Sequence, residues 1–269
     1  MEMNDGNVLS NTNQIKNEDL NELLYFLSKV DGVISIIGTQ GSGKTTLVDS
    51  IIEDNYDCSF KVMGGHSIEE YSEKHPNGEF NEIGNIDDEV AEYEKDGYLS
   101  GEFTCDKLIV DELSKDKDYY NVLVVSENGG NVIATSHHRS GLDLFESYAK
   151  ICISLGKYNS MVKVFEDMNA FRFVIIMCDI DGVKYIDSIN EVTYEDNSLS
   201  ERPIISINHA TKEYVVTNKI TTDGYEDIYN SLMYCDKVKL SKWYSKFLEK
   251  YFSDEPTNGF NLTMNSREY

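Results

Sequence analysis

The sequence is poor in cysteine, and the few cysteines are not spaced as in a disulfide framework or a metal site. Its five cysteines lie far apart, with no C-x-x-C pair and no spacing to the five histidines that is typical of a metal site. They are Cys58, Cys105, Cys152, Cys178 and Cys235. Several stand in apolar, strand-like runs, so we expect reduced thiols in the core. A disulfide-stapled secreted domain is excluded.

The sequence also lacks long apolar runs. No stretch approaches the roughly 18 residues that a membrane-spanning helix needs, and the polar, acidic first 15 residues do not resemble a signal peptide. We therefore expect a cytoplasmic protein.

Basic residues are scarce. Lysine and arginine together number 24 against 48 aspartates and glutamates, which gives a formal charge of −24. No local cluster of basic residues offsets this charge, which would repel a polyphosphate backbone. Nucleic acid is therefore not an expected partner. The 40% hydrophobic content is sufficient for one substantial α/β core with a small appended subdomain.

One segment carries a specific chemical signature. Residues 38–45 match the P-loop pattern G-x-x-x-x-G-K-[ST], and the apolar run 33–37 precedes them where the motif requires a strand. A helix over residues 43–54 is expected to follow. The nucleotide-binding residues predicted from this match are Gly38, Thr39, Gln40, Gly41, Ser42, Gly43, Lys44, Thr45 and Thr46.

The chemistry of the P-loop explains this pattern. Glycines let successive backbone N–H groups approach phosphate oxygens, and the helix directs the positive end of its dipole at the same anion. Lys44 is expected to reach the β and γ phosphates of a bound nucleotide, and Thr45 to offer its hydroxyl to Mg²⁺. The sequence thus predicts ATP with Mg²⁺ as the ligand.

A second apolar strand, residues 108–110, ends in Asp111 and Glu112, the form of a Walker B element. We expect this strand to lie beside the P-loop strand, where Asp111 would hold the metal ion and Glu112 would orient or deprotonate the attacking water. The next strand ends in a polar run that includes Thr135 and His137, either of which could detect the γ-phosphate.

The pattern of apolar segments predicts an α/β fold. After a mobile tail over residues 1–16, helix-like spacing begins at Asn17 and ends before residue 31. Strands are expected over residues 60–63, 107–110, 131–134 and 150–155, with helices over 119–127 and, weakly, 87–95. Alternating strands and helices indicate a mostly parallel sheet flanked by helices.

Beyond residue 158 the alternation of strands and helices gives way to a different pattern. Close-spaced strands are expected over residues 162–165, 171–177 and 183–189, with Asp181-Gly182 as a hairpin turn, followed by a strand pair within 204–216. Residues 225–252 have helical, amphipathic spacing. We therefore predict a P-loop core with a β-hairpin extension over 17–217 and a C-terminal helical segment and tail over 218–269.

The order of these motifs resembles that of the secretion and pilus-motor ATPases of the type II and type IV systems, including the PilT-like retraction motors. The resemblance implies a RecA-like P-loop NTPase fold and a hexameric, Mg²⁺-dependent ATPase. It assigns catalytic roles to Lys44 and Glu112 and the His-box role to His137. It also implies secretion, pilus or conjugation machinery as partners, with contact to the inner face of the membrane only through them.

The sequence departs from that family in three respects. Asp-Glu stands where the family usually has Gly-Glu, and the acidic box has only Glu69-Glu70 as a candidate. Family members normally carry a domain that helps clamp nucleotide between subunits, whereas 37 residues precede Gly38 here. This chain has only four arginines, so an arginine finger from the chain itself must be one of them, and Arg139 is our first choice.

Two other functions fit the motifs. One is a DNA-handling P-loop ATPase of a phage or plasmid, which the negative charge disfavours. The other is a non-hydrolysing module that binds nucleotide to set its assembly state, which the intact Asp111-Glu112 pair disfavours.

Overall fold

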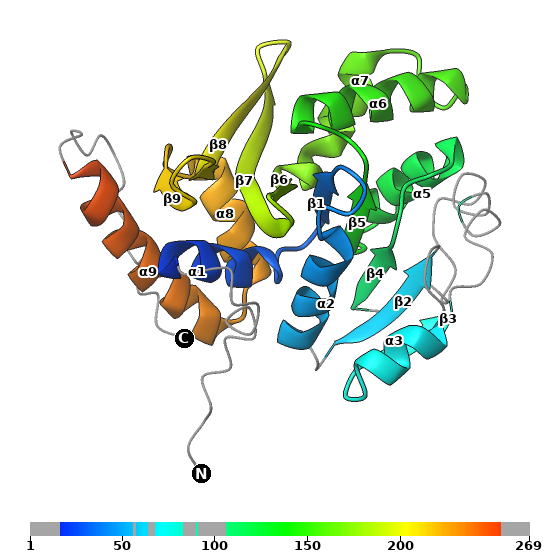
Figure 1. The fold of residues 1–269 in the computed structure, drawn as a ribbon. Helices are drawn as coiled ribbons and strands as arrows, with labels where there is room; N and C mark the ends of the chain where they lie inside the picture. The colour runs from blue at the N-terminus through cyan, green and yellow to red at the C-terminus, as the bar shows by residue number, and fades with distance from the viewer. Residues whose placement is uncertain (1–16, 56–57, 64–67, 83–89, 91–105, 254–269) are drawn as a thin grey trace, which may run out of the picture.

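The computed structural model describes residues 17–55, 58–63, 68–82, 90 and 106–253 of the chain. Within them one nine-stranded sheet has the order β3-β2-β4-β5-β1-β6-β7-β8-β9 (Figure 1). The first six strands in that order run parallel to their neighbours, and the last three continue the sheet antiparallel. The predicted fold class, a mostly parallel α/β sheet with an antiparallel extension, is confirmed.

The parallel strands are short, and all except the edge strand β3 are mainly apolar. They are β1 (Val33–Gly38), β2 (Ser59–Met63), β3 (Glu79–Glu82), β4 (Lys107–Val110), β5 (Val132–Ser136) and β6 (Phe173–Ile180). Every residue of β1, β4 and β5 is buried. Continuous apolar sequence in these strands follows from their position, because helices cover both faces of a parallel sheet.

Side chains from alternate positions of the strands enter two separate cores. Ile34 and Ile36 of β1 belong to one core, whereas Val33 and Ile37 belong to the other. The first core contains side chains of α1 (Glu18–Leu27), α2 (Lys44–Asp54), α3 (Ile68–Lys74), α8 (Thr222–Ser231) and α9 (Tyr234–Phe252). The second contains those of α5 (Asp116–Glu127), α6 (Gly141–Ser154) and α7 (Met161–Asp167), which group together in Figure 1.

The antiparallel part consists of β7 (Val183–Glu195), β8 (Ser198–Asn208) and β9 (Glu213–Val216). Asp181 and Gly182 have φ angles of 58° and 82°, so the predicted β6–β7 turn has the left-handed backbone that suits a two-residue hairpin. Asp196 and Asn197 (φ 52° and 60°) form a second such turn between β7 and β8, which extends both strands beyond their predicted bounds.

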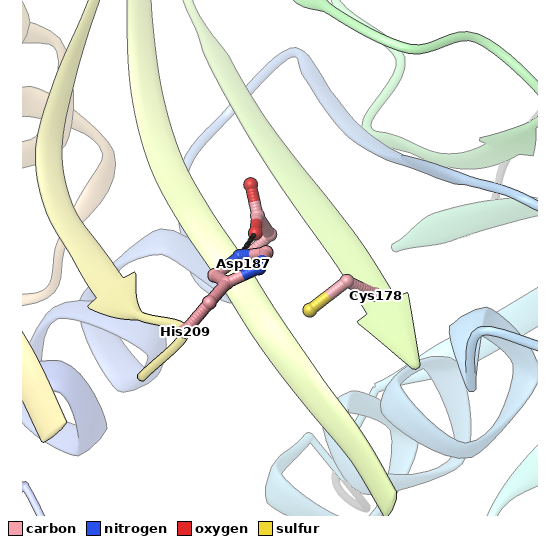
Figure 2. A group of neighbouring side chains, drawn as sticks. All are labelled: Cys178, Asp187 and His209. Carbon is pink, nitrogen blue, oxygen red and sulfur yellow. Dashed lines mark hydrogen bonds and ion pairs between the residues drawn. The ribbon is translucent and has the colours of Figure 1, made fainter. Parts of the chain in front are cut away.

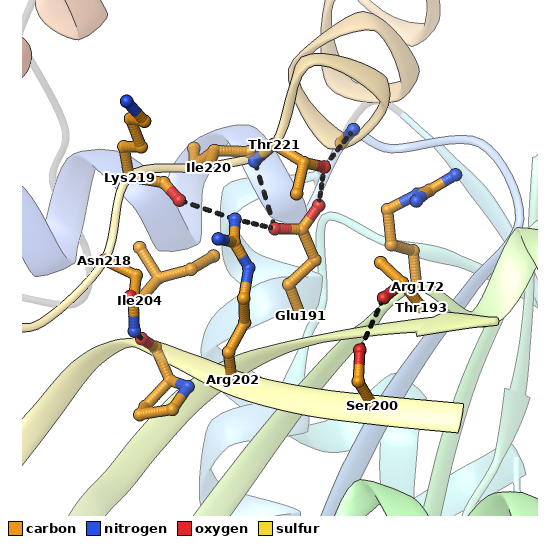
Figure 3. A network of polar contacts seen from close by, with 12 residues as sticks. Arg172, Glu191, Thr193, Ser200, Arg202, Ile204, Asn218, Lys219, Ile220 and Thr221 are labelled. Atoms are coloured by element: carbon orange, nitrogen blue, oxygen red, sulfur yellow. Dashed lines mark hydrogen bonds and ion pairs between the residues drawn. The ribbon is translucent and has the colours of Figure 1, made fainter. Parts of the chain in front are cut away.

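A buried carboxylate joins this extension to the C-terminal helices (Figure 3). Glu191 of β7 is 0% exposed and pairs with the guanidinium of Arg202 on β8, with 2.9 Å between Oε2 and the nitrogen. Glu191 also accepts hydrogen bonds from the backbone and hydroxyl of Thr221, the N-cap of α8. At the far end of the helical segment, Lys250 of α9 donates to Asp19 of α1 over 2.7 Å.

Two predicted strands are helices. Residues 150–154 form the end of α6, with Leu155 as its C-cap, and 162–165 lie within α7. Serine N-caps begin both helices: Ser140 accepts from Asp143 N, and Ser160 accepts from Lys163 N. The alternation of apolar residues in these short windows resembled a strand because the helical period is visible only over the whole of 141–154.

Other predictions on elements are mostly met. The helix from Asn17, the P-loop helix and the strands at 60–63, 107–110 and 131–134 are confirmed, as are the helices within 119–127 and 225–252. The region expected to be irregular after β2 contains α3 and β3. The predicted tail over 1–16, the weak helix over 87–95 apart from Val90, and the chain beyond Ser253 lie outside the described residues. No described helix is long and apolar enough to cross a membrane.

Candidate functional site: the P-loop edge of the sheet

The P-loop has a backbone that requires glycine at two positions. Gly38 (φ +148°) ends β1 and Gly43 (φ +98°) is the N-cap of α2. A Cβ at Gly38 would lie 2.5 Å from the carbonyl oxygen of Met177 and 2.7 Å from Ser42 Oγ. A side chain at position 38 would therefore force β6 and the loop apart.

The N-terminus of α2 offers unsatisfied donors. Side chains cap α1, α6, α7 and α8, whereas Gly43 supplies no cap to α2 and the first turn of α2 carries no acidic residue. Ser42 Oγ is buried and has no hydrogen-bond partner among the described residues. Uncapped N–H groups, a helix dipole and an orphaned hydroxyl together suit an anion.

Lys44 is the cation of this site. Its residue is 8% exposed, and its Nζ donates to the carbonyl oxygens of Gly38 (2.9 Å) and Thr39 (3.1 Å). Burial lowers the pKa of Lys44, while the negative charges of Glu112 and Asp111 act in the opposite direction. A phosphate oxygen entering the loop would compete with these carbonyls for the ammonium group.

Two carboxylates follow β4. Asp111 is 7% exposed, and its backbone N–H donates to Met63 O of β2 over 3.2 Å. The hydroxyl of Thr135, which is 2% exposed, donates to the carbonyl of Asp111, and Leu113 N donates to Thr135 O (2.8 Å). Thr135 is thus bonded to the backbone beneath the carboxylates.

His137 connects the P-loop to the second carboxylate. Its Nε2 lies 3.0 Å from Glu112 Oε1, and its Nδ1 lies 3.2 Å from both Lys44 Nζ and Gly38 O. Which of the latter two contacts is a hydrogen bond depends on the tautomer of the imidazole. The structure therefore brings together Lys44, Glu112 and His137, three side chains that are separated in the sequence.

The strand order differs from the prediction in one respect. We expected the strand ending in Asp111 to be the neighbour of the P-loop strand, but β5 lies between β4 and β1. The carboxylates still reach the site because all three parallel strands end at the same edge of the sheet. His137 follows the intervening strand β5 and contacts both Lys44 of the P-loop helix and Glu112 after β4.

The remaining predicted residues lie around this centre. Thr39, Gln40, Gly41 and Thr46 are exposed, and Thr45 is half-buried. Arg139 is also exposed, two residues beyond His137. Glu69 and Glu70 are exposed on the first turn of α3, which begins shortly after β2.

Three residues near the site were not predicted from the sequence. A Cβ at Gly43 would lie 3.0 Å from the Cβ of Lys184 and 3.6 Å from the Cε of Met177, so the β6–β7 hairpin packs on the P-loop. Tyr71 of α3 is 3% exposed, and burial together with the charge of Asp111 raises its pKa. These contacts are tertiary, and no local sequence pattern indicates them.

This fold and this edge of the sheet define a P-loop α/β protein. No protein-family model matches the sequence, and no curated protein matches it significantly. Among solved structures, the Legionella pneumophila ATPase DotB has 14% identity and a TM-score of 0.47, with 70% of this chain and 51% of that one covered.

Two further solved structures are similar to this chain. The VirB11 ATPase of the Brucella suis type IV secretion system has 18% identity and a TM-score of 0.47, with 66% of this chain and 54% of that one covered. The pilus retraction motor PilT with bound ADP has 16% identity and a TM-score of 0.42, with 84% and 56% covered. This chain thus spans about half the length of each.

Proposed function

We propose that this chain is an ATPase that binds ATP with Mg²⁺ at the P-loop edge of the sheet. The observation that supports it best is the continuous set of contacts from Gly38 through Lys44 and His137 to Glu112. Lys44 and Glu112 contact the two nitrogens of one imidazole, which supports the proposal that Lys44 binds phosphate and Glu112 acts as the base.

Each residue has a distinct part in this proposal. The uncapped N-terminus of α2 and Lys44 bind the β and γ phosphates. Thr45 and Asp111 are the oxygen donors that would hold Mg²⁺, which prefers such ligands and would neutralise charge on the phosphates. Glu112 accepts the proton of the attacking water or orients that water.

His137 has a positioning part in this proposal. Its contact with Glu112 fixes the carboxylate, and its contact with Lys44 places the imidazole at the edge of the phosphate site. The ring can therefore respond to a phosphate that engages Lys44 and transmit that response to Glu112.

The proposal extends to a motor subunit that works as an oligomer with secretion, pilus or conjugation machinery in the cytoplasm. Among the described arginines, Arg172 is paired with Asp227 and Arg202 with the buried Glu191. Arg139 is exposed beside the site and makes no ion pair with another described residue. It is the arginine best placed to reach nucleotide in a neighbouring subunit.

The decisive experiment measures nucleotide binding and phosphate release with the purified protein. Wild type should bind ATP and hydrolyse it only with Mg²⁺, and Glu112→Gln should retain binding while losing at least about 100-fold in turnover. Glu146→Gln, an exposed glutamate on α6, is the matched control and should behave as wild type. Tight binding without turnover in wild type would instead favour a nucleotide-gated assembly module.

A further inference from the structure

Away from the P-loop residues, three side chains of types that can bind metal ions lie close together where β6 joins the antiparallel extension. Cys178 is on β6, Asp187 is on β7, and His209 follows the end of β8 (Figure 2). One ligand atom from each lies within 4.8 Å of the others. Cys178 and Asp187 are half-buried, and His209 is exposed. The strands β6 and β7 and the turn after β8 thus each contribute one donor.

Irregularities of the backbone bring these donors together. The pairing of β6 with β7 shifts between Ile176 and Met177, whose partners are Ser188 and Ile186, so Asp187 is an extra residue in a β-bulge. His209 begins the turn between β8 and β9. The Nε2 of His209 lies 2.5 Å from Oδ1 of Asp187.

We propose that Cys178, Asp187 and His209 form a binding site for a transition-metal cation of the Zn²⁺ type. A thiolate, an imidazole and a carboxylate are the ligands that Zn²⁺ uses, and three protein ligands leave a fourth position for water. Mg²⁺ and Ca²⁺ require oxygen donors, so the thiol and imidazole select against them.

The geometry needs a small adjustment to accept the ion. Tetrahedral Zn²⁺ with bonds of about 2.1 Å to nitrogen and oxygen separates those two atoms by about 3.4 Å. The contact between His209 and Asp187 must therefore open by about 1 Å. The side chains of His209 and Asp187 are 61% and 33% exposed, which leaves them room to rotate.

A nucleophilic Cys-His-Asp triad is the competing interpretation of the same three residues. In a triad the imidazole stands between the thiol and the carboxylate. Here the imidazole of His209 contacts Asp187 through Nε2, and no hydrogen bond joins it to the Cys178 thiol in Figure 2.

The site would fasten the strands beside the P-loop. Cys178 directly follows Met177, whose carbonyl oxygen abuts Gly38, and Asp187 lies on the same strand as Lys184, which abuts Gly43. A metal ion bound here would link β6, β7 and β8 by direct bonds. Its binding does not require that the P-loop hydrolyse ATP.

Titration of the metal-free, full-length protein with Co²⁺ tests the site, because a cobalt–thiolate bond gives a charge-transfer band in the near ultraviolet. Wild type should show this band, and excess Zn²⁺ but not Mg²⁺ should abolish it. Cys178→Ser should lose the band, whereas Cys235→Ser, which changes an exposed thiol on α9, should keep it. Absence of the band in wild type, or its persistence in Cys178→Ser, would overturn the proposal.

Two further variants separate this site from other divalent sites. His209→Ala should weaken Zn²⁺ binding, measured by calorimetry, by more than the roughly 10- to 100-fold that loss of a supporting partner costs. Asp111→Asn should leave the cobalt–thiolate band unchanged, because it alters only the P-loop edge. Circular dichroism of each variant reports whether it is folded. An unchanged Zn²⁺ affinity in folded His209→Ala would also contradict the assignment.

Discussion

His137 Nε2 lies 3.0 Å from Glu112 Oε1, so the imidazole at the end of β5 supports the carboxylate at the end of β4. Replacing His137 by alanine should lower turnover by about 100-fold, since an unsupported Glu112 no longer holds the attacking water. Nucleotide affinity should change little. Steady-state hydrolysis and equilibrium binding measure the two effects separately.

His138 is the matched control for that change. Its Nδ1 contacts Ser136 Oγ over 2.8 Å, and its ring packs edge-on against Tyr119 instead of meeting Glu112. His138→Ala should therefore leave turnover within a few-fold of wild type. Equal losses in both variants would contradict the role given to His137.

Gly38→Ala should destabilise the fold and abolish nucleotide binding. The added Cβ would meet Met177 O at 2.5 Å on a backbone with φ +148°, and we expect a cost of about 2–4 kcal/mol in the free energy of unfolding. Gly129→Ala is the control, because Gly129 (φ +78°) has nothing within 4 Å of a Cβ and should lose only about 1–2 kcal/mol. Urea denaturation measures both.

Glu191→Ala should be more destabilising than loss of a surface ion pair. Removing this fully buried carboxylate leaves Arg202 and Thr221 without their partner, which should cost about 3–5 kcal/mol. Glu146→Ala breaks only the exposed pair with Lys150 and should change stability by less than about 1 kcal/mol. Similar losses in chemical denaturation would show that the buried pair contributes little.

Glu127 should make the protein less stable as pH rises towards neutrality. Burial, and then the charge of Asp167, raise the pKa of Glu127 to about 7 from the ordinary 4.5. The folded state therefore binds more protons than the unfolded state between these values, and stability falls as pH rises through this window. Glu127→Gln should lose less stability between pH 4.5 and 7 than wild type. Urea denaturation at several pH values tests this, and parallel curves would refute it.

Local sequence was sufficient to predict the features that depend on neighbouring residues. The P-loop glycines and the Asp181-Gly182 turn require particular φ angles, and those requirements are visible in the sequence itself. The carboxylates after β4 were located for a similar reason, because an apolar strand followed by acids marks a sheet edge. Their roles remain proposals.

Features that depend on packing were not predicted. The segment 150–155 was assigned to a strand, yet Cys152 is buried with Tyr148 and Ala149 on one face of α6. The position of β5 between β1 and β4 depends on long-range pairing. Sequence spacing gave no sign of the cluster around Cys178, because its three residues come from two strands and a turn, and the position of Asp187 depends on a β-bulge.

Met177 lies so close to Gly38 that β6 cannot move towards the P-loop without displacing it. Any force that displaces the outer hairpin towards β1 is therefore borne by the turn that would grip the nucleotide. A movement of the antiparallel strands would therefore be transmitted to the P-loop through the β6–β7 hairpin.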